Sequence, residues 1–364
     1  MKVERIPALR RHVALVLAPV LVVASALAAR ATLASADPAP VTSYRQLAGV
    51  GSDTGQDVMN HLGKVIGNGT VIASWDARPS GTTIRTKASG PNGDCAMFRP
   101  NGSVTGRTAL ELAQSVSQPT YGCVDFARSY NYPDRVNPRG TGTYTYIPFA
   151  VDAMTVAINT NSDLPTSYSL NLLRHIYQCL TTDIAGVPVT PLLPRAGTGA
   201  RQFWLHTMGI SEQELVYGDY PCVQDLNHTL QPNDGTALNG HNDYVLPYSV
   251  AQWISQGRNG QQVGGEQVVI EDRRGQSILA SVGGVNPRNG DGTLNVNFPI
   301  RTDVYNVVPR AKLTAGSIVS NTFSGPNSSV CQQSTVIQAY GFGFRTAASP
   351  DLLAQPCGST ALAY

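Results

Sequence analysis

Three short segments rich in glycine and hydroxyl side chains each stand just before a stretch that predicts a helix. They occupy residues 51–54, 101–103 and 197–199. A helix N-terminus presents unpaired N–H groups and a partial positive charge, glycine lets the backbone approach closely, and serine or threonine adds a donor. Each segment taken singly is an ordinary helix start, but three of them in one chain indicate an oxyanion-binding site.

Arginine side chains lie close to two of these regions. Arg128 comes after the expected strand end at Asp125-Phe126, and Arg195 and Arg201 flank the Gly-Thr-Gly turn at 197–199. An arginine can donate two parallel charge-assisted hydrogen bonds to an oxyanion. The sequence leaves open whether these arginines bind a ligand or have surface or structural roles.

Signatures of catalysis and cofactor binding are weak or missing in the sequence. Residues 49–55 read G-x-G-x-x-x-G, which misses the spacing of the dinucleotide motif, and G-x-x-x-x-G-K-[ST], H-E-x-x-H and G-x-S-x-G do not occur. The six histidines show no metal-ligand spacing. We therefore expect no cofactor, no bound metal and no enzymatic activity. A secreted phosphatase or other hydrolase is the enzymatic alternative, although no nucleophile with an adjacent base is evident.

The first 36 residues have the order of a secretory signal peptide. A basic stretch precedes an apolar run at 13–29, and Ala-Ser-Ala at 34–36 predicts cleavage after Ala36. A membrane anchor is the alternative, but the run is short for one and contains Pro19. The leader holds five of the 26 basic and one of the 24 acidic residues, so the mature chain would be near neutral. We expect a secreted monomer without the overall positive electrostatic potential that would attract nucleic acid.

Six cysteines lie beyond the leader, and none forms a C-x-x-C pair. Export would place them in an oxidising compartment, so three disulfides are favoured over metal ligation. Sequence alone does not choose among the pairings. Pairing of nearest neighbours is our expectation: Cys95 with Cys123, Cys179 with Cys222, and Cys331 with Cys357.

Strand-like and helix-like segments alternate along the chain, which predicts an α/β fold. Helices are expected at 56–65, 107–114, 170–180 and 201–208, the first of them capped by residues 52–54. Strands are expected at 44–51, 70–75, 148–158, 187–193, 294–298 and 303–308. The chain is longer than one core usually supports, so two lobes are expected.

Five motifs follow one another in a characteristic order. They are LAGVGS at 47–52, RPNGSVTG at 99–106, VDFARS at 124–129, PFAVD at 148–152 and RAGTGARQF at 195–203. This order resembles that of the phosphate-binding receptors of bacterial ABC transporters. The resemblance covers about residues 44–254, and more faintly 298–309. It implies a type II periplasmic-binding-protein fold, in which two α/β lobes joined by crossing strands hold an anion between them.

Discontinuous lobes follow from this resemblance together with the apolar segment at 148–158. We predict that residues 37–147 and 252–364 build the first lobe and that residues 148–251 build the second. The segment at 148–158 would then be the first crossing strand.

Carried over by position, the resemblance implies a set of ligand contacts in three loops and at one strand end. The set is Ser52, Asp53, Thr54, Gly102, Ser103, Arg128, Ser129, Arg195, Thr198 and Gly199. The third loop departs from the family, because its S-G-T turn is here Thr198-Gly199-Ala200 and residues 195–198 are one residue shorter than their counterpart. A further departure is Tyr130, which stands where the family has a carboxylate that accepts the proton of hydrogen phosphate.

These patterns predict a solute-binding protein that holds a small oxyanion for uptake through an ABC-type permease. Phosphate is the first choice if Asp53 points into the cleft, because sulfate has no proton to give at neutral pH. If Asp53 instead caps the helix, sulfate or an empty cleft is favoured. The alternative is a structural or adhesive surface protein with a degenerate ligand site, which the substitutions at Ala200 and Tyr130 favour.

Overall fold

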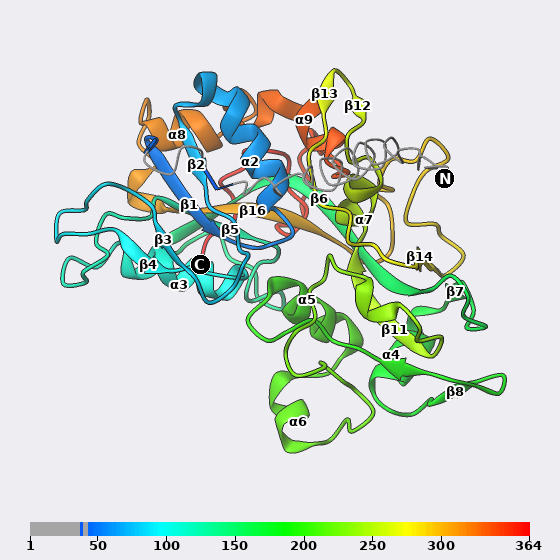
Figure 1. Ribbon diagram of the computed structural model, residues 1–364. Helices are drawn as coiled ribbons and strands as arrows, with labels where there is room; N and C mark the ends of the chain where they lie inside the picture. Colours follow the sequence, from blue (N-terminus) through cyan, green and yellow to red (C-terminus); the bar gives the residue numbers. More distant parts are fainter. Residues whose placement is uncertain (1–36, 39–42) are drawn as a thin grey trace, which may run out of the picture. The chain divides into compact units, whose positions relative to one another are not determined.

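The computed structural model describes residues 37–38 and 43–364 (Figure 1). The predicted signal peptide lies outside these residues. No helix in the described part is long and apolar enough to cross a membrane.

A mixed eight-stranded sheet lies at the centre of this described part (Figure 1). Its strands are β1 (Leu47–Gly51), β2 (Ile72–Ser74), β5 (Phe126–Ser129), β6 (Tyr144–Asn159), β10 (Thr190–Pro191), β11 (Tyr244–Ser249), β14 (Ser277–Leu279) and β16 (Arg301–Pro309). The order is β10-β11-β6-β16-β5-β1-β2, with β14 also paired to β6. β2 and β5 run parallel to β1, whereas β16 is antiparallel to both β5 and β6. The sheet therefore confirms the α/β class.

The long strand β6 links the two ends of this sheet. Residues 144–153 pair with β16, and residues 154–159 pair with β11 and β14. Every residue of β6 after Tyr144 is buried, as expected for a central strand covered on both faces. Figure 1 shows it in green beside the orange β16.

Helices connect and cover the strands. They are α2 (Gln56–Val65), α3 (Ser103–Leu112), α4 (Leu170–Tyr177), α5 (Gly199–Met208), α6 (Glu212–Tyr217), α7 (Val250–Gly257), α8 (Ile318–Phe323) and α9 (Ser334–Ala339). α2 buries Val58, Met59 and Leu62 against the main core, which matches a single apolar face. α4 packs on α5 through Tyr177 and Trp204, whose ring centroids are 5.4 Å apart.

Short strand pairs lie outside the central sheet. They are β3 (Thr83–Arg85) with β4 (Ala96–Phe98), β7 (Ser167–Tyr168) with β15 (Ser281–Val282), β8 (Asp183–Ile184) with β9 (Val187–Pro188), and β12 (Gln262–Val263) with β13 (Glu266–Gln267).

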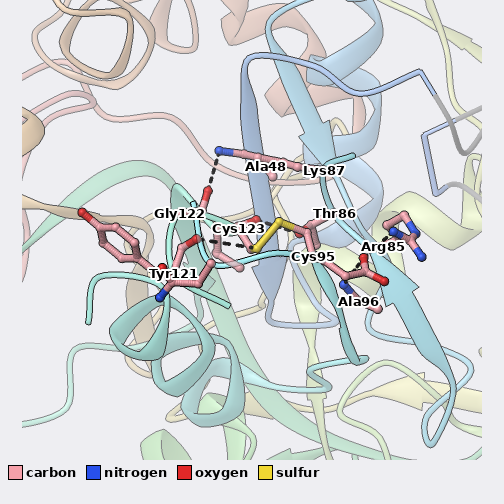
Figure 2. Close-up of a disulfide and its surroundings, with 12 residues drawn as sticks. Ala48, Arg85, Thr86, Lys87, Cys95, Ala96, Tyr121, Gly122 and Cys123 are labelled. Carbon is pink, nitrogen blue, oxygen red and sulfur yellow. Dashed lines mark hydrogen bonds and ion pairs between the residues drawn. A yellow bond between two sulfur atoms is a disulfide. The ribbon is translucent and has the colours of Figure 1, made fainter. Parts of the chain in front are cut away.

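The cysteines form three disulfides in the nearest-neighbour pattern expected from the sequence. The pairs are Cys95–Cys123, Cys179–Cys222 and Cys331–Cys357. Figure 2 shows the first, beside which Lys87 Nζ donates to the carbonyl oxygen of Gly122 at 2.9 Å. This disulfide encloses the loop at 101–103, and the second encloses the loop at 197–199.

Two predicted strands are wrong in the structure. Residues 187–193 divide into the separate short strands β9 and β10, because the prolines at 188 and 191 have no N–H for a ladder. Residues 294–298 are a turn in which Asn295 Oδ1 accepts from the N–H of Asn297 at 3.0 Å, since asparagine side chains favour such local bonds. The helix expected at 170–180 ends at Tyr177, shortly before Cys179, whose φ is 58°.

The boundaries of the two predicted lobes stay a prediction. By their contacts, the described residues form one compact unit rather than two. The continuous sheet explains this, because β6 and β16 carry ladder hydrogen bonds through its middle.

Candidate functional site

The first loop, residues 51–54, follows β1 and leads into α2. A Cβ at Gly51, where φ is 122°, would lie 2.5 Å from the carbonyl oxygen of Arg128, so this approach requires glycine. Ser52, Asp53 and Thr54 are each at most 1% exposed. The hydroxyls of Ser52 and Thr54 hydrogen-bond to each other at 2.8 Å.

The predicted helix cap at 52–54 is wrong. The N-cap of α2 is Gly55, and no side chain bonds to the first turn. Asp53 is buried instead, and its carboxylate meets side chains from distant parts of the sequence.

The second loop, residues 101–103, contacts the first and the third. Asn101 forms a parallel bridge with Gly51. Gly102 has a φ of 124°, and a Cβ there would lie 2.6 Å from the carbonyl oxygen of Gly197. Both amide atoms of the buried Asn101 lack a hydrogen-bond partner within the described residues.

The third loop, residues 197–199, forms the N-terminus of α5. Thr198 Oγ1 accepts from the N–H of Arg201 at 3.3 Å and donates to the carbonyl oxygen of Arg195 at 3.0 Å. A Cβ at Gly199 would lie 2.4 Å from Ser103 Oγ. The second loop is thus in contact with the first and with the third, and the Thr198 hydroxyl is occupied as a helix cap.

A side-chain bridge joins the first loop to the third. With the Gln231 amide oriented so that each atom meets a complementary partner, its nitrogen donates to Asp53 Oδ2 at 2.6 Å and its oxygen accepts from Arg195 Nε at 3.1 Å. The opposite orientation would place oxygen against carboxylate and nitrogen against guanidinium. Arg195 Nη2 is buried and has no hydrogen bond to any described residue.

Burial sets the electrostatics of this pair. It raises the pKa of Asp53, and the positive charge of Arg195 opposes that rise. Burial also lowers the pKa of Arg195, and the charge of Asp53 opposes that change. Each group therefore depends on the other to stay charged out of water.

Arg273 is a second buried arginine whose charge acts on Asp53. Its Nη1 donates to Glu271 at 2.9 Å, while its Nε and Nη2 have no hydrogen bond among the residues described. Burial alone would lower the pKa of Arg273, but the carboxylates of Asp57, Glu271 and Asp234 raise it. The surroundings of Asp53 thus contain two guanidinium groups with unpaired nitrogens.

Arg128 and Ser129 have mainly protein partners. Arg128 is fully buried, and it donates to the Ser52 carbonyl at 3.0 Å, to Ser74 Oγ at 2.9 Å and to the Trp75 carbonyl at 2.7 Å. Burial lowers the pKa of Arg128 to about 10. Ser129 Oγ donates to a backbone carbonyl of the same chain segment at 2.7 Å. These contacts favour structural roles over the ligand contacts that the sequence predicted.

Tyr130 is buried, and its own N–H donates to Ser103 Oγ at 2.9 Å. Burial, and then the nearby carboxylate of Asp152, raise the pKa of Tyr130 well above its ordinary value. Asp152 accepts from Ser249 Oγ and from the N–H of Ala251 at 2.9 Å, at the start of α7. Asp152 therefore serves that helix N-terminus.

Sequence reasoning missed three residues around Asp53, namely Gln231, Gln252 and Arg273. Gln252 Nε2 donates to the carbonyl oxygen of Thr54 at 2.7 Å. None of the three stands in a motif, and each is more than 170 positions from the first loop. Only the fold places them there, so no local signal could have found them.

The loops leave several polar groups with hydrogen-bonding capacity to spare. Arg195 Nη2 is unpaired, and the Ser103 hydroxyl accepts one bond and keeps its hydrogen for another. One hydrogen also remains in the Ser52–Thr54 hydroxyl pair. Asp53 supplies the acceptor.

Comparison with known proteins gives a fold and no close relative. No protein-family model matches the chain, and no curated protein matches it. An ABC-type phosphate transport receptor from Vibrio cholerae has a similar fold, with a TM-score of 0.50 and 13% identity over 82% of this chain and 99% of that chain. A phosphate ABC transporter substrate-binding protein from Clostridium perfringens, solved with bound phosphate, has a TM-score of 0.48 and 13% identity over 79% and 97%.

A regulatory domain of a LysR-family regulator from N. meningitidis is also matched, with a TM-score of 0.39 and 9% identity over 81% of this chain and 93% of that chain. At these identities the likeness concerns the fold alone. The chain has the mixed α/β fold of the type II periplasmic binding proteins.

Proposed function

We propose that this protein is a secreted, non-enzymatic solute-binding protein that holds a small oxyanion, with phosphate preferred, where the three loops meet. The observation that supports this most is the buried Asp53 carboxyl beside Arg195, whose guanidinium keeps one nitrogen unpaired. A buried guanidinium nitrogen without a partner is costly unless a ligand pairs with it.

The chemistry of this pair favours a protonated oxyanion. Hydrogen phosphate offers oxygens that accept from Arg195 and Ser103, and it also carries a P–OH that can donate to Asp53. Sulfate has only acceptors at neutral pH, so it would meet the Asp53 carboxylate without a proton between them. Asp53 would then accept the proton of hydrogen phosphate, the role that a carboxylate at the position of Tyr130 has in the phosphate-binding receptors.

Delivery to an ABC-type permease is the role that such a binding protein would serve. Both phosphate-related proteins with similar folds are named as transport receptors or substrate-binding proteins. The three disulfides suit an oxidising, extracytoplasmic compartment.

Calorimetry with phosphate and sulfate tests the proposal on the wild type, Asp53→Asn and Arg195→Ala. We expect the wild type to prefer phosphate, Arg195→Ala to weaken phosphate binding by about tenfold or more, and Asp53→Asn to lose the preference over sulfate. Arg310→Ala, an exposed arginine, is the matched control and should bind as the wild type does. Equal binding of both ions, or none, by the wild type contradicts the proposal.

A structural surface protein with a degenerate site is the second candidate. It is favoured by the close packing of the second and third loops, where a Gly199 Cβ would lie 2.4 Å from Ser103 Oγ, and by the capping role of the Thr198 hydroxyl. Native mass spectrometry of the purified protein separates the two, because a solute-binding protein should copurify with a small anion.

A further inference from the structure

Gln231 is held between Asp53 and Arg195 by the backbone on either side of it. The N–H of Arg195 donates to the carbonyl of Leu230 at 2.9 Å, and the N–H of Ser249 donates to the carbonyl of Pro232 at 2.8 Å. Gln231 as a residue is 8% exposed. Its amide therefore lies in a fixed place between a carboxylate and a guanidinium.

The two bonds of this amide are those that hydrogen phosphate would make to the same groups. The amide oxygen accepts from Arg195 Nε at 3.1 Å, as a phosphoryl oxygen would. The amide nitrogen donates to Asp53 Oδ2 at 2.6 Å, as a P–OH would. A primary amide and a protonated oxyanion share this combination of one acceptor and one donor, whereas sulfate has no donor.

We propose that the Gln231 side chain is an internal stand-in for a protonated oxyanion, and that a ligand has to displace it to reach Asp53 Oδ2 and Arg195 Nε. This inference rests on the proposed function of the same site. Gln231 is then a specificity-determining residue, because a ligand replaces both amide bonds only if it can both accept and donate.

The displacement weakens the apparent affinity of the protein. A ligand that binds only after the Gln231 amide has left Asp53 and Arg195 is bound less tightly. Its apparent affinity falls in proportion to the small fraction of molecules in which the amide has already left. The amide bonds to charged, buried partners, which makes such bonds stronger than neutral ones. Removing the amide should therefore tighten binding rather than weaken it.

The test is calorimetry with inorganic phosphate on the wild type, Gln231→Ala and Gln231→Met. Alanine removes both hydrogen bonds and the bulk, and methionine removes the bonds while keeping a similar length. We expect both variants to bind phosphate more tightly than the wild type, by about tenfold for alanine. Gln262→Ala, which truncates an exposed glutamine of β12, is the matched control. Thermal unfolding shows that each variant is folded.

The outcomes separate this inference from the proposed function. Tighter binding in the variants supports both. Binding by the variants alone supports the stand-in but contradicts the proposed function, because Gln231 then blocks the wild-type site. If the wild type binds phosphate and both variants bind it equally or more weakly, the stand-in is overturned and the proposed function stands. If no form binds phosphate, both are overturned.

Discussion

Arg128 and Arg195, the two arginines among the predicted ligand contacts, have different hydrogen-bond partners in this fold. Arg128 lies at the end of β5 and is fully buried, with its donors bound to Ser52, Ser74 and Trp75. Arg195 lies before the third loop, is partly exposed, and keeps Nη2 unpaired. One side chain ties the first loop to its neighbouring strands, and the other has capacity left for a ligand.

Under the proposed function, this difference separates a structural arginine from a ligand-binding one. A guanidinium whose donors all meet fixed carbonyls and hydroxyls cannot exchange them for a ligand without disrupting the loop. A guanidinium with an unsatisfied nitrogen gains a bond when a ligand arrives. Replacing Arg128 should therefore mainly lower the free energy of unfolding, whereas replacing Arg195 should mainly weaken ligand binding.

Replacing Arg128 by alanine should have the largest effect on stability. The change leaves buried carbonyls unpaired and a cavity beneath the first loop, so we expect a loss of about 3 to 5 kcal/mol in the free energy of unfolding. Urea denaturation measures it, and Arg195→Ala is the comparison, with a smaller expected loss, because Arg195 is partly exposed and the buried Asp53 can take up a proton once the arginine is gone. Similar losses for the two variants would erase the distinction.

Two of the disulfides differ in what they enclose. Cys179–Cys222 encloses the third loop, whereas Cys331–Cys357 encloses no residue of the proposed site. Removing Cys179–Cys222, which has a sequence separation of 43, should cost about 4 kcal/mol by the chain-entropy model. It should also weaken phosphate binding, because the enclosed segment carries Arg195. The control is removal of Cys331–Cys357, with a separation of 26 and an expected cost of about 3.5 kcal/mol.

Binding that is equally weakened by removal of either disulfide would contradict this enclosure argument. Denaturant unfolding and calorimetry on the same two Cys→Ser double variants give both quantities.

Asp57, in the first turn of α2, should make stability depend on pH. Burial, and then the charge of Asp76, raise the pKa of Asp57 from 3.8 to about 6. Between these values the folded chain binds more protons than the unfolded chain, so the free energy of unfolding should fall as pH rises from about 4 to 6, by about 3 kcal/mol for this group.

Asp57→Asn should flatten that part of the stability curve, whereas Asp163→Asn, on the surface, should not. Urea denaturation at a series of pH values provides the measurement. A curve for Asp57→Asn that parallels the wild type would show that Asp57 does not titrate in this range.

Thr198 should have the smallest effect, because its oxygen caps α5 rather than a ligand. Thr198→Ala should cost about 1 kcal/mol of stability, whereas Thr198→Ser keeps the oxygen and should be close to neutral. Thermal denaturation checks both. If Thr198→Ala lowers phosphate affinity much more than stability, the Thr198 hydroxyl contacts the ligand and this prediction is wrong.

Local sequence patterns predicted many of the elements well. Helix 56–65 begins and ends where it was expected, and the apolar segment at 148–158 lies within the longer β6. The failures at 187–193 and 294–298 come from proline and asparagine, which break a ladder where hydrophobicity alone predicts one. The order of the cysteines along the chain also led to the observed disulfides, because each cysteine pairs with its nearest neighbour and closes a short loop.

The contacts around Asp53 could not be predicted in the same way. Helix caps and strand periodicity depend on neighbours a few positions apart, so the sequence by itself determined the α/β class and the three glycine-rich loops. Gln231 meets Asp53 only because β6 and the strands beside it bring residues 178 positions apart into contact. Whether a buried arginine keeps a free nitrogen depends on every neighbour at once. Only the tertiary structure therefore decided that every guanidinium nitrogen of Arg128 has a partner and that Arg195 Nη2 has none among the described residues.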